Sequence, residues 1–191
     1  MNARADGREG RLRAVKEAAW ILFSETGYAS TTIRQIAAKA KVSTGTVMSF
    51  GGKETLLLAQ FEDGIAEHLV APVFTTESAA DAVWRFFEPY FEFYAERPEL
   101  SRSYGRVLLS PAGAQHPALG AQAREFNSLV ASEIGRRYPR AREADAAAAA
   151  TALFAIYIHA LVLWVSEAAT LAQATAVFRH QVAWQLARFE I

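Results

Sequence analysis

The chain has 191 residues, enough for one compact domain or two small ones, and 52% of them are hydrophobic, which excludes a disordered chain. It contains no cysteine, so disulfides and thiolate metal sites are excluded and a reducing compartment is expected. The net charge is zero, yet residues 1–55 carry nine basic and five acidic side chains, while the other 136 residues carry 11 and 15. This basic head suggests a polyanion as its partner, although chance clustering would give the same pattern.

The first 70 residues show helical periodicity interrupted by turn residues. Residues 1–13 are charged and lack the apolar stretch of a secretory signal, so we expect a cytoplasmic protein. Gly27 is a typical helix terminator, Ser30, Thr31 and Ser43 are good N-caps, and Gly51 follows the third helical stretch. We therefore expect helices over 8–24, 31–40, 43–50 and 53–70.

The remainder of the chain is also helical in pattern, since no segment shows the strict alternation of a half-buried strand. Loops are predicted over 72–78 and 111–117, and Pro89 lies inside a predicted helix, where we expect a kink. The sequence therefore predicts an all-α fold, with further helices over 81–96, 98–109, 119–138, 141–168 and 171–189.

Residues 146–166 carry no formal charge apart from a possible protonated His159, and they are long enough to cross a bilayer. The stretch begins with alanine and threonine, which are weakly hydrophobic, and its flanks provide no strong positive anchor. A helix that is apolar on all sides is more simply a buried one. We expect it to pack on both sides inside the protein, with no membrane as a partner.

Three short helices, the second and third separated by a few residues, predict a helix-turn-helix. In this motif the second helix crosses the phosphate backbone and the third places its N-terminal residues on base edges in the major groove. Ser43, Thr44 and Thr46 offer hydroxyls at that position, and Gly45 reduces bulk there. The pattern found alone is weak, because many helical hairpins resemble it.

The local sequence is more specific. The segment Gly27–Ala37 resembles the start of the TetR family motif, in which a glycine and an aromatic residue precede Thr-Thr-Ile or Thr-Thr-Val. The segment Val42–Val47, followed by Phe50 and then by Gly-Lys-Glu at 52–54, resembles the rest of it. The resemblance covers residues 8 to about 60. It implies a DNA-binding domain over 1–52 and a helical ligand-binding and dimerisation domain over 53–191.

The resemblance also implies roles for single residues. Thr32 and Lys53, at the starts of the second and fourth helices, should contact phosphates, and the first residues of the third helix should contact bases. Plain N-capping is the alternative role for Thr32 and Ser43. The predicted DNA-contacting residues are Thr32, Arg34, Ser43, Thr44, Gly45, Thr46, Met48 and Lys53.

Two positions depart from the family pattern. Lys41 stands where the family usually has glycine, which costs about 1 kcal/mol if the backbone there is left-handed. The third helix is one residue shorter before Phe50, and Met48 stands where a tyrosine that contacts phosphate is common. The contacts of this end of the helix are therefore in question.

The C-terminal part is rich in aromatic residues, most of which should form a core, and any pocket among them would favour a flat or apolar ligand. Tyr157 and His159 share one helix, either as a hydrogen-bonded core pair or as a polar anchor in a pocket. The predicted ligand-lining residues are Trp84, Phe87, Phe91, Tyr104, Phe126, Tyr157 and His159.

The function expected from the resemblance is that of a homodimeric transcriptional repressor. The last two helices would pair with their copies in a four-helix interface, intramolecular packing being the alternative. A small apolar or aromatic effector would release a palindromic operator. No metal or cofactor motif and no catalytic constellation is present in the sequence, so we do not expect an enzyme. The alternatives are a helical interaction module or a small helical enzyme that does not bind DNA.

Overall fold

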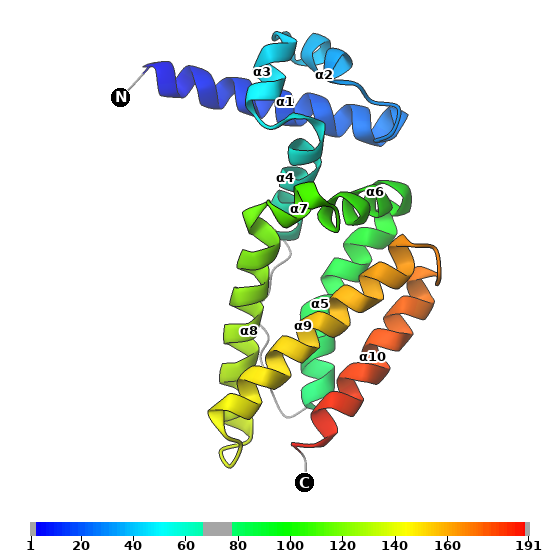
Figure 1. Cartoon of the computed structure of the whole chain (residues 1–191). Helices are drawn as coiled ribbons and strands as arrows, with labels where there is room; N and C mark the ends of the chain where they lie inside the picture. Colours follow the sequence, from blue (N-terminus) through cyan, green and yellow to red (C-terminus); the bar gives the residue numbers. More distant parts are fainter. Residues whose placement is uncertain (1–2, 67–77, 190–191) are drawn as a thin grey trace. The chain divides into compact units, whose positions relative to one another are not determined.

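The computed structural model describes residues 3–66 and 78–189, and every regular element in these ranges is an α-helix (Figure 1), which confirms the predicted all-α fold. The chain divides into two compact units, Met1–Ala66 with Arg97–His116, and Glu67–Glu96 with Pro117–Ile191. The first unit contains α1 (Ala3–Thr26), α2 (Ile33–Ala40), α3 (Thr44–Ser49), α4 (Gly52–Ala66), α6 (Pro98–Leu108) and α7 (Pro111–Ala114). The second contains α5 (Ala79–Glu96), α8 (Pro117–Arg137), α9 (Glu143–Val165) and α10 (Leu171–Ala187).

The first unit is built around α1 and α4. Helix α1 packs on α2 and α4, while α3 packs on α2 and α4 and so closes the N-terminal group of helices. Phe23, Ile36 and Val47 bring α1, α2 and α3 to a common core, since each is at most 1% exposed. On the other side of α4, the ring of Phe61 stacks on Tyr104 of α6 at 4.2 Å between centroids. Helices α1, α2 and α3 form a tri-helical head. This head packs on α4, which also packs on α6.

In the second unit, α9 packs against both α8 and α10, and α10 packs on α5. The buried side of α9 repeats at helical spacing, with Ala146, Ala149, Leu153, Tyr157 and Trp164 each at most 4% exposed. The alanines allow close approach of the neighbouring backbone, and the aromatic residues fill the space further along the helix. The core of this unit is consequently narrow at one end of α9 and aromatic at the other.

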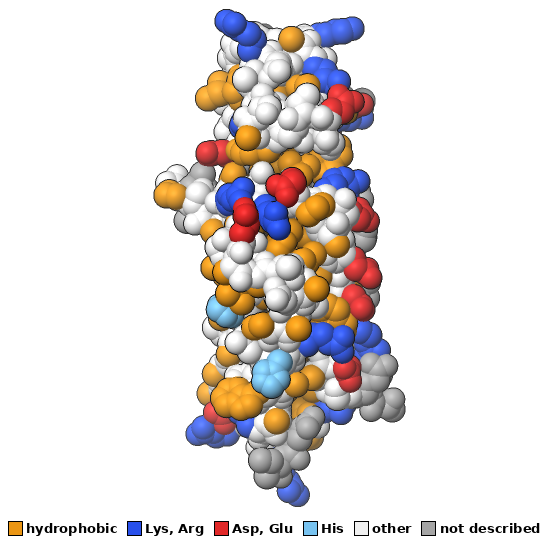
Figure 2. Space-filling model, turned by 90° about the vertical axis from the view of Figure 1, so that its right-hand side faces the viewer, with side chains coloured by type: hydrophobic (Ala, Val, Ile, Leu, Met, Phe, Trp, Pro, Cys, Tyr) orange, Lys and Arg blue, Asp and Glu red, His pale blue; other side chains and the backbone are white. Residues whose placement is uncertain are grey.

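The opposite side of α9 is not covered by the residues that the structure describes. The helix is long and apolar enough to cross a membrane by length and composition, yet only 39% of its most apolar stretch is buried inside the molecule. The packing on both sides that the sequence predicts is therefore present on one side alone. Hydrophobic side chains are exposed over much of the face shown in Figure 2, and Trp184 of α10 is 75% exposed.

The predicted helices correspond to the observed ones with shifted ends. Helix α1 begins at Ala3 instead of residue 8, and α9 ends three residues earlier than expected. The loop predicted over 111–117 is partly wrong, because Pro111 begins the one-turn helix α7, where its missing N–H needs no partner. Helix α5 runs through Pro89, and the kink there stays a prediction. The predicted helix end at 67–70 and most of the loop at 72–78 lie outside the described residues.

Candidate nucleic-acid interface

The turn between α1 and α2 is fixed by hydrogen bonds around Thr31. Gly27 has a positive φ of 83°, which glycine adopts without a steric penalty. The Thr31 hydroxyl donates to the Gly27 carbonyl at 2.8 Å, and Thr31 is only 2% exposed. The chain therefore reverses direction in a defined way before α2 begins, one residue later than the predicted cap at Thr31.

Thr32 is the N-cap of α2 and forms a complete capping box with Gln35. The Gln35 amide N–H donates to the Thr32 hydroxyl at 3.3 Å. The Gln35 side-chain oxygen accepts hydrogen bonds from the Thr32 N–H and from the Thr32 hydroxyl, both at 2.8 Å. The capping role considered for Thr32 is thus present. Both residues are exposed, so the cap also faces solvent at the helix end where anions are favoured.

The turn between α2 and α3 depends on Lys41, which adopts the left-handed conformation at φ 56° and ψ 43°. Its N–H and that of Val42 donate to carbonyls in the last turn of α2, Val42 to Ala37 at 3.0 Å. A lysine thus stands at the position where the family pattern has glycine, and it bears the steric cost of that backbone conformation.

Helix α3 presents its first turn to solvent while its middle is anchored in the core. Ser43 is the N-cap, and its hydroxyl accepts a hydrogen bond from the Thr46 N–H at 3.1 Å. Thr44 and Gly45 are exposed, whereas Val47 is fully buried. A Cβ added to Gly45 would meet only the Ser43 hydroxyl, at 3.7 Å. Packing within the protein does not require glycine there, so the small residue matters for what approaches from outside.

Two further predicted contact residues lie on exposed surface. Arg34 is exposed in the first turn of α2, and Met48 in the last turn of α3 is 57% exposed. The exposed positions of α2 and α3 therefore include a basic, a hydroxyl-bearing and an apolar side chain.

Lys53 is placed differently from the prediction. Its ammonium donates to the carbonyls of Tyr28 at 2.8 Å and of Thr31 at 3.0 Å, and it lies 4.2 Å from the centre of the Tyr28 ring. Burial lowers the pKa of Lys53, with the charge of Glu54 acting in the opposite direction. Burial also raises the pKa of Tyr28 to about 12. The residue that the resemblance assigns to phosphate therefore ties the turn before α2 to the start of α4.

The predicted ligand-lining residues separate into three groups. Phe87, Phe126 and Tyr157 form one packed cluster, in which Phe87 lies 4.9 Å from Phe126 and 4.6 Å from Tyr157 between centroids. Phe91 joins it through Tyr157, and the partly exposed Trp84 stacks on Phe91 at 5.7 Å. Tyr104 belongs to the other unit, and His159 is exposed on α9. The structure thus brings five of the seven together.

One contact in this cluster was not predicted. The hydroxyl oxygens of Tyr94 and Tyr157 lie 2.6 Å apart, and neither residue is more than 4% exposed. Burial raises the pKa of Tyr157 to about 12, while the hydrogen bond with Tyr94 acts in the opposite direction. Tyr157 therefore pairs with a tyrosine 63 positions away rather than with His159, its neighbour in sequence. The core pair considered for Tyr157 and His159 is not formed.

A tri-helical head with a capped, exposed third helix, in an all-helical chain, defines the class of helix-turn-helix DNA-binding proteins. Residues 16–59 match the model of the bacterial regulatory proteins of the tetR family. The HTH-type transcriptional regulator HbdR of Aromatoleum sp. (strain CIB) is 38% identical over 86 residues, covering 41% of this chain and 38% of that protein. The match thus spans less than half of this relative. The similarity to the tetR family model is thus confined to the helix-turn-helix part of this chain.

Solved structures share the fold over nearly the whole chain. A TetR transcriptional regulator from Rhodococcus sp. RHA1 has a TM-score of 0.70 at 21% identity, covering 95% of this chain and 98% of that one. A TetR variant from Acinetobacter baumannii AYE in complex with minocycline has a TM-score of 0.60 at 20% identity, covering 92% and 94%. The likeness extends through both units, and at this identity it concerns the fold alone.

Proposed function

We propose that this protein is a DNA-binding transcriptional regulator that acts as a homodimer, each protomer placing α3 in the major groove of one half of a palindromic operator. The observation that carries the proposal is the first turn of α3, which is capped by Ser43, exposed at Thr44 and Gly45, and anchored by the buried Val47. A rigid helix start without bulky side chains can approach base edges closely.

The remaining head residues divide by chemistry. Thr32 and Arg34 lie in the N-cap and first turn of α2, where helix dipole and side-chain charge both favour phosphate. Ser43, Thr44 and Thr46 carry hydroxyls that suit bases or phosphates, and Met48 suits an apolar contact such as a thymine methyl. Lys53 supports the turn before α2 and thereby positions Thr32.

Dimerisation is proposed through α9 and α10. Their exposed positions recur at helical spacing and are mostly small, including Ala148 and Ala155 on α9 and Ala176 and Ala183 on α10. Trp184, 75% exposed, lies next to this stripe and would be buried by a second copy. A four-helix interface of small residues permits close helix approach, and it would cover the apolar side of α9 that this chain leaves open.

The second unit is proposed to bind a small apolar or aromatic effector at the cluster around Phe87 and Tyr157, with Trp84 at its edge. The minocycline complex of a protein with this fold supports a small-molecule effector. Effector binding would favour a dimer geometry in which the heads no longer fit the operator, so that the protein acts as a repressor. We propose a cytoplasmic regulator, with neither catalysis nor a membrane in its function.

The test is the binding of the full-length protein and of Thr44→Ala to cognate and scrambled duplexes over a salt series. The variant should lose about 1–3 kcal/mol on the cognate duplex and little on the scrambled one, because a base contact carries specificity. Wild-type affinity should fall by orders of magnitude as salt rises, since a dimer neutralises several phosphates.

Ser132→Ala is the matched control, because it removes an exposed hydroxyl from α8 in the other unit. Equal losses on both duplexes for Thr44→Ala would show that α3 does not read bases. A salt-independent affinity would remove DNA binding from the proposal.

A further inference from the structure

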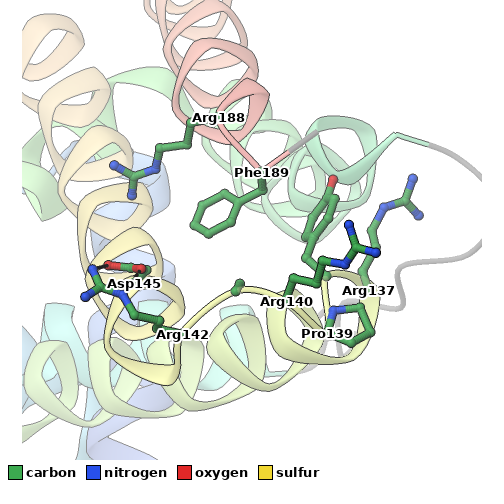
Figure 3. Close-up of a pocket in the computed structure, with 9 residues that line it drawn as sticks. Arg137, Pro139, Arg140, Arg142, Asp145, Arg188 and Phe189 are labelled. Atoms are coloured by element: carbon green, nitrogen blue, oxygen red, sulfur yellow. Dashed lines mark hydrogen bonds and ion pairs between the residues drawn. The ribbon is translucent and has the colours of Figure 1, made fainter. Parts of the chain in front are cut away.

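A cavity of about 790 Å³ lies in the second unit, at the turn between α8 and α9 and the end of α10 (Figure 3). Its lining includes Arg137, Arg140 and Arg142 from the turn and Arg188 with Phe189 from the end of α10. None of the residues of the aromatic cluster or of the helix-turn-helix belongs to this lining. The cavity is therefore separate from both sites described above.

The charge of the lining is strongly unbalanced. Four guanidinium groups face one carboxylate, that of Asp145. Asp145 is held by Arg142 through two hydrogen bonds, at 2.7 and 2.8 Å. Hydrogen bonding from Arg142 lowers the pKa of Asp145, and the charge of Arg188 acts in the same direction, so this carboxylate is ionised. Among the described residues, Arg140 has no carboxylate at ion-pair distance, and Arg188 interacts with Asp145 only at longer range.

The neighbouring Arg136 shows that this imbalance is specific to the cavity. Arg136 lies in the last turn of α8, next to Arg137, but it does not line the cavity. Its guanidinium is paired with Glu133 at 2.7 Å. Arg136 thus has a counter-ion in its own helix, whereas among the described residues Arg140 has none and Arg188 shares Asp145 at longer range. Like charges held around one concave surface repel, and an anion between them would relieve that repulsion.

Tyr138 forms part of the wall of the cavity. The hydroxyl oxygen of Tyr138 is buried and has no hydrogen-bond partner among the described residues. A buried hydroxyl in this state is unfavourable unless something else satisfies it. The Tyr138 ring stacks on Phe189 at 5.7 Å, and the guanidinium of Arg188 lies 5.1 Å from the centre of the Phe189 ring. These two contacts hold Tyr138, Arg188 and Phe189 against one another in the wall of the cavity.

We propose that this cavity binds a small soluble molecule carrying two or more oxyanion groups, either phosphates or carboxylates. Arg140 and Arg188 supply the charge, since guanidinium groups match both oxyanions with two parallel hydrogen bonds. Two separated cationic groups select for a ligand with more than one negative charge, and the cavity is large enough to hold an organic body between them.

The experiment uses pyrophosphate as the probe and the full-length protein in phosphate-free buffer at low ionic strength, followed by titration calorimetry. Wild-type protein should bind pyrophosphate, and the double variant Arg140→Ala/Arg188→Ala should bind it at least about tenfold more weakly. Arg136→Ala is the matched control, because it removes a positive charge from the same turn outside the cavity, and it should bind as the wild type does.

Three results would overturn the proposal. These are no measurable pyrophosphate binding by the wild type, an equal loss for Arg136→Ala and the double variant, or no loss for the double variant. Vesicles containing phosphatidylglycerol form a second arm of the experiment. If the protein binds these vesicles through Arg140 and Arg188 and binds no pyrophosphate, the partner is a lipid surface and the soluble ligand is excluded. Binding of an operator duplex is measured alongside, so that loss of DNA binding is recognised separately.

Discussion

Lys41 adopts a left-handed backbone conformation in the turn that sets the angle between α2 and α3. Because a Cβ atom is unfavourable in that conformation, Lys41→Gly should raise the free energy of unfolding by about 0.5–1 kcal/mol. Urea denaturation measures this change. Lys39→Gly is the control, since Lys39 lies within α2, where glycine should lower stability by about 1 kcal/mol. A loss of stability in both variants would contradict the strain assigned to Lys41.

Lys53 makes two hydrogen bonds to the carbonyls of Tyr28 and Thr31, across 25 and 22 positions of sequence. We expect Lys53→Ala to lower the free energy of unfolding by about 1 kcal/mol, because charge-assisted bonds at a partly exposed site contribute this much. DNA affinity should fall as well, since the turn before Thr32 is loosened, while the salt dependence of binding stays the same.

Lys39→Ala is the matched control for Lys53→Ala, because Lys39 is an exposed lysine of the same head whose ion pair with Glu25 is long, at 3.9 Å. Its removal should change stability little. If Lys53→Ala instead leaves stability unchanged and makes the salt dependence shallower by about one per protomer, the ammonium acts on a phosphate.

At the scale of helices, the sequence predicts the starts that depend on capping by nearby side chains. Ser43 and Thr32 act as N-caps through their own side chains and the residues three positions later. Helix α7 was missed because Gly113 sits in a four-residue helix against the carbonyl of Leu108, a contact that no local pattern reveals. The hydrogen bonds of Lys53 could not be predicted for the same reason, since its carbonyl partners lie outside its own helix, and its predicted phosphate contact stays a prediction.

The aromatic cluster of the second unit joins α5 to α9 through the paired hydroxyls of Tyr94 and Tyr157. Tyr94→Phe removes the one hydrogen-bond partner shown for the Tyr157 hydroxyl, and should lower the free energy of unfolding by about 1–3 kcal/mol. The double variant Tyr94→Phe/Tyr157→Phe should be more stable than Tyr94→Phe, because no hydroxyl then remains unsatisfied at that contact. Thermal or urea unfolding of the set measures the coupling, and strictly additive losses would contradict it.

At the scale of the whole molecule, the proposed dimer predicts that Trp184 is central to assembly. Trp184→Arg should weaken dimerisation by about thirtyfold or more, since buried interface tryptophans commonly contribute 2 kcal/mol or more. Sedimentation measures the mass relative to the 20.9 kDa chain. Leu109→Arg is the control, because it places the same charge on an exposed apolar residue of the other unit. A monomeric wild type would contradict the proposed interface.

The fold class and the DNA-binding head could be read from sequence because they rest on helical period, caps and a short motif. The site in the second unit could be predicted only in part. Phe87, Phe126 and Tyr157 do meet, but Tyr104 packs with Phe61 in the other unit, and His159 faces solvent. The aromatic composition indicates that a cluster exists. Which residues belong to the cluster depends on which helices pack together, and contacts between residues distant in sequence decide that packing.

The capping box at the start of α2 changes the thermodynamics of any anion contact there. In the free protein the Thr32 N–H and hydroxyl already donate to the Gln35 side-chain oxygen. An arriving phosphate oxygen would replace an amide oxygen, so the number of hydrogen bonds would hardly change and the contact would release little enthalpy. The contact would instead gain from a smaller loss of conformational entropy, because Gln35 holds both Thr32 donors in place before the nucleic acid binds. The Gln35 side-chain oxygen therefore occupies the position that a phosphate oxygen would take. If a phosphate displaced it, the Gln35 side chain would regain conformational freedom.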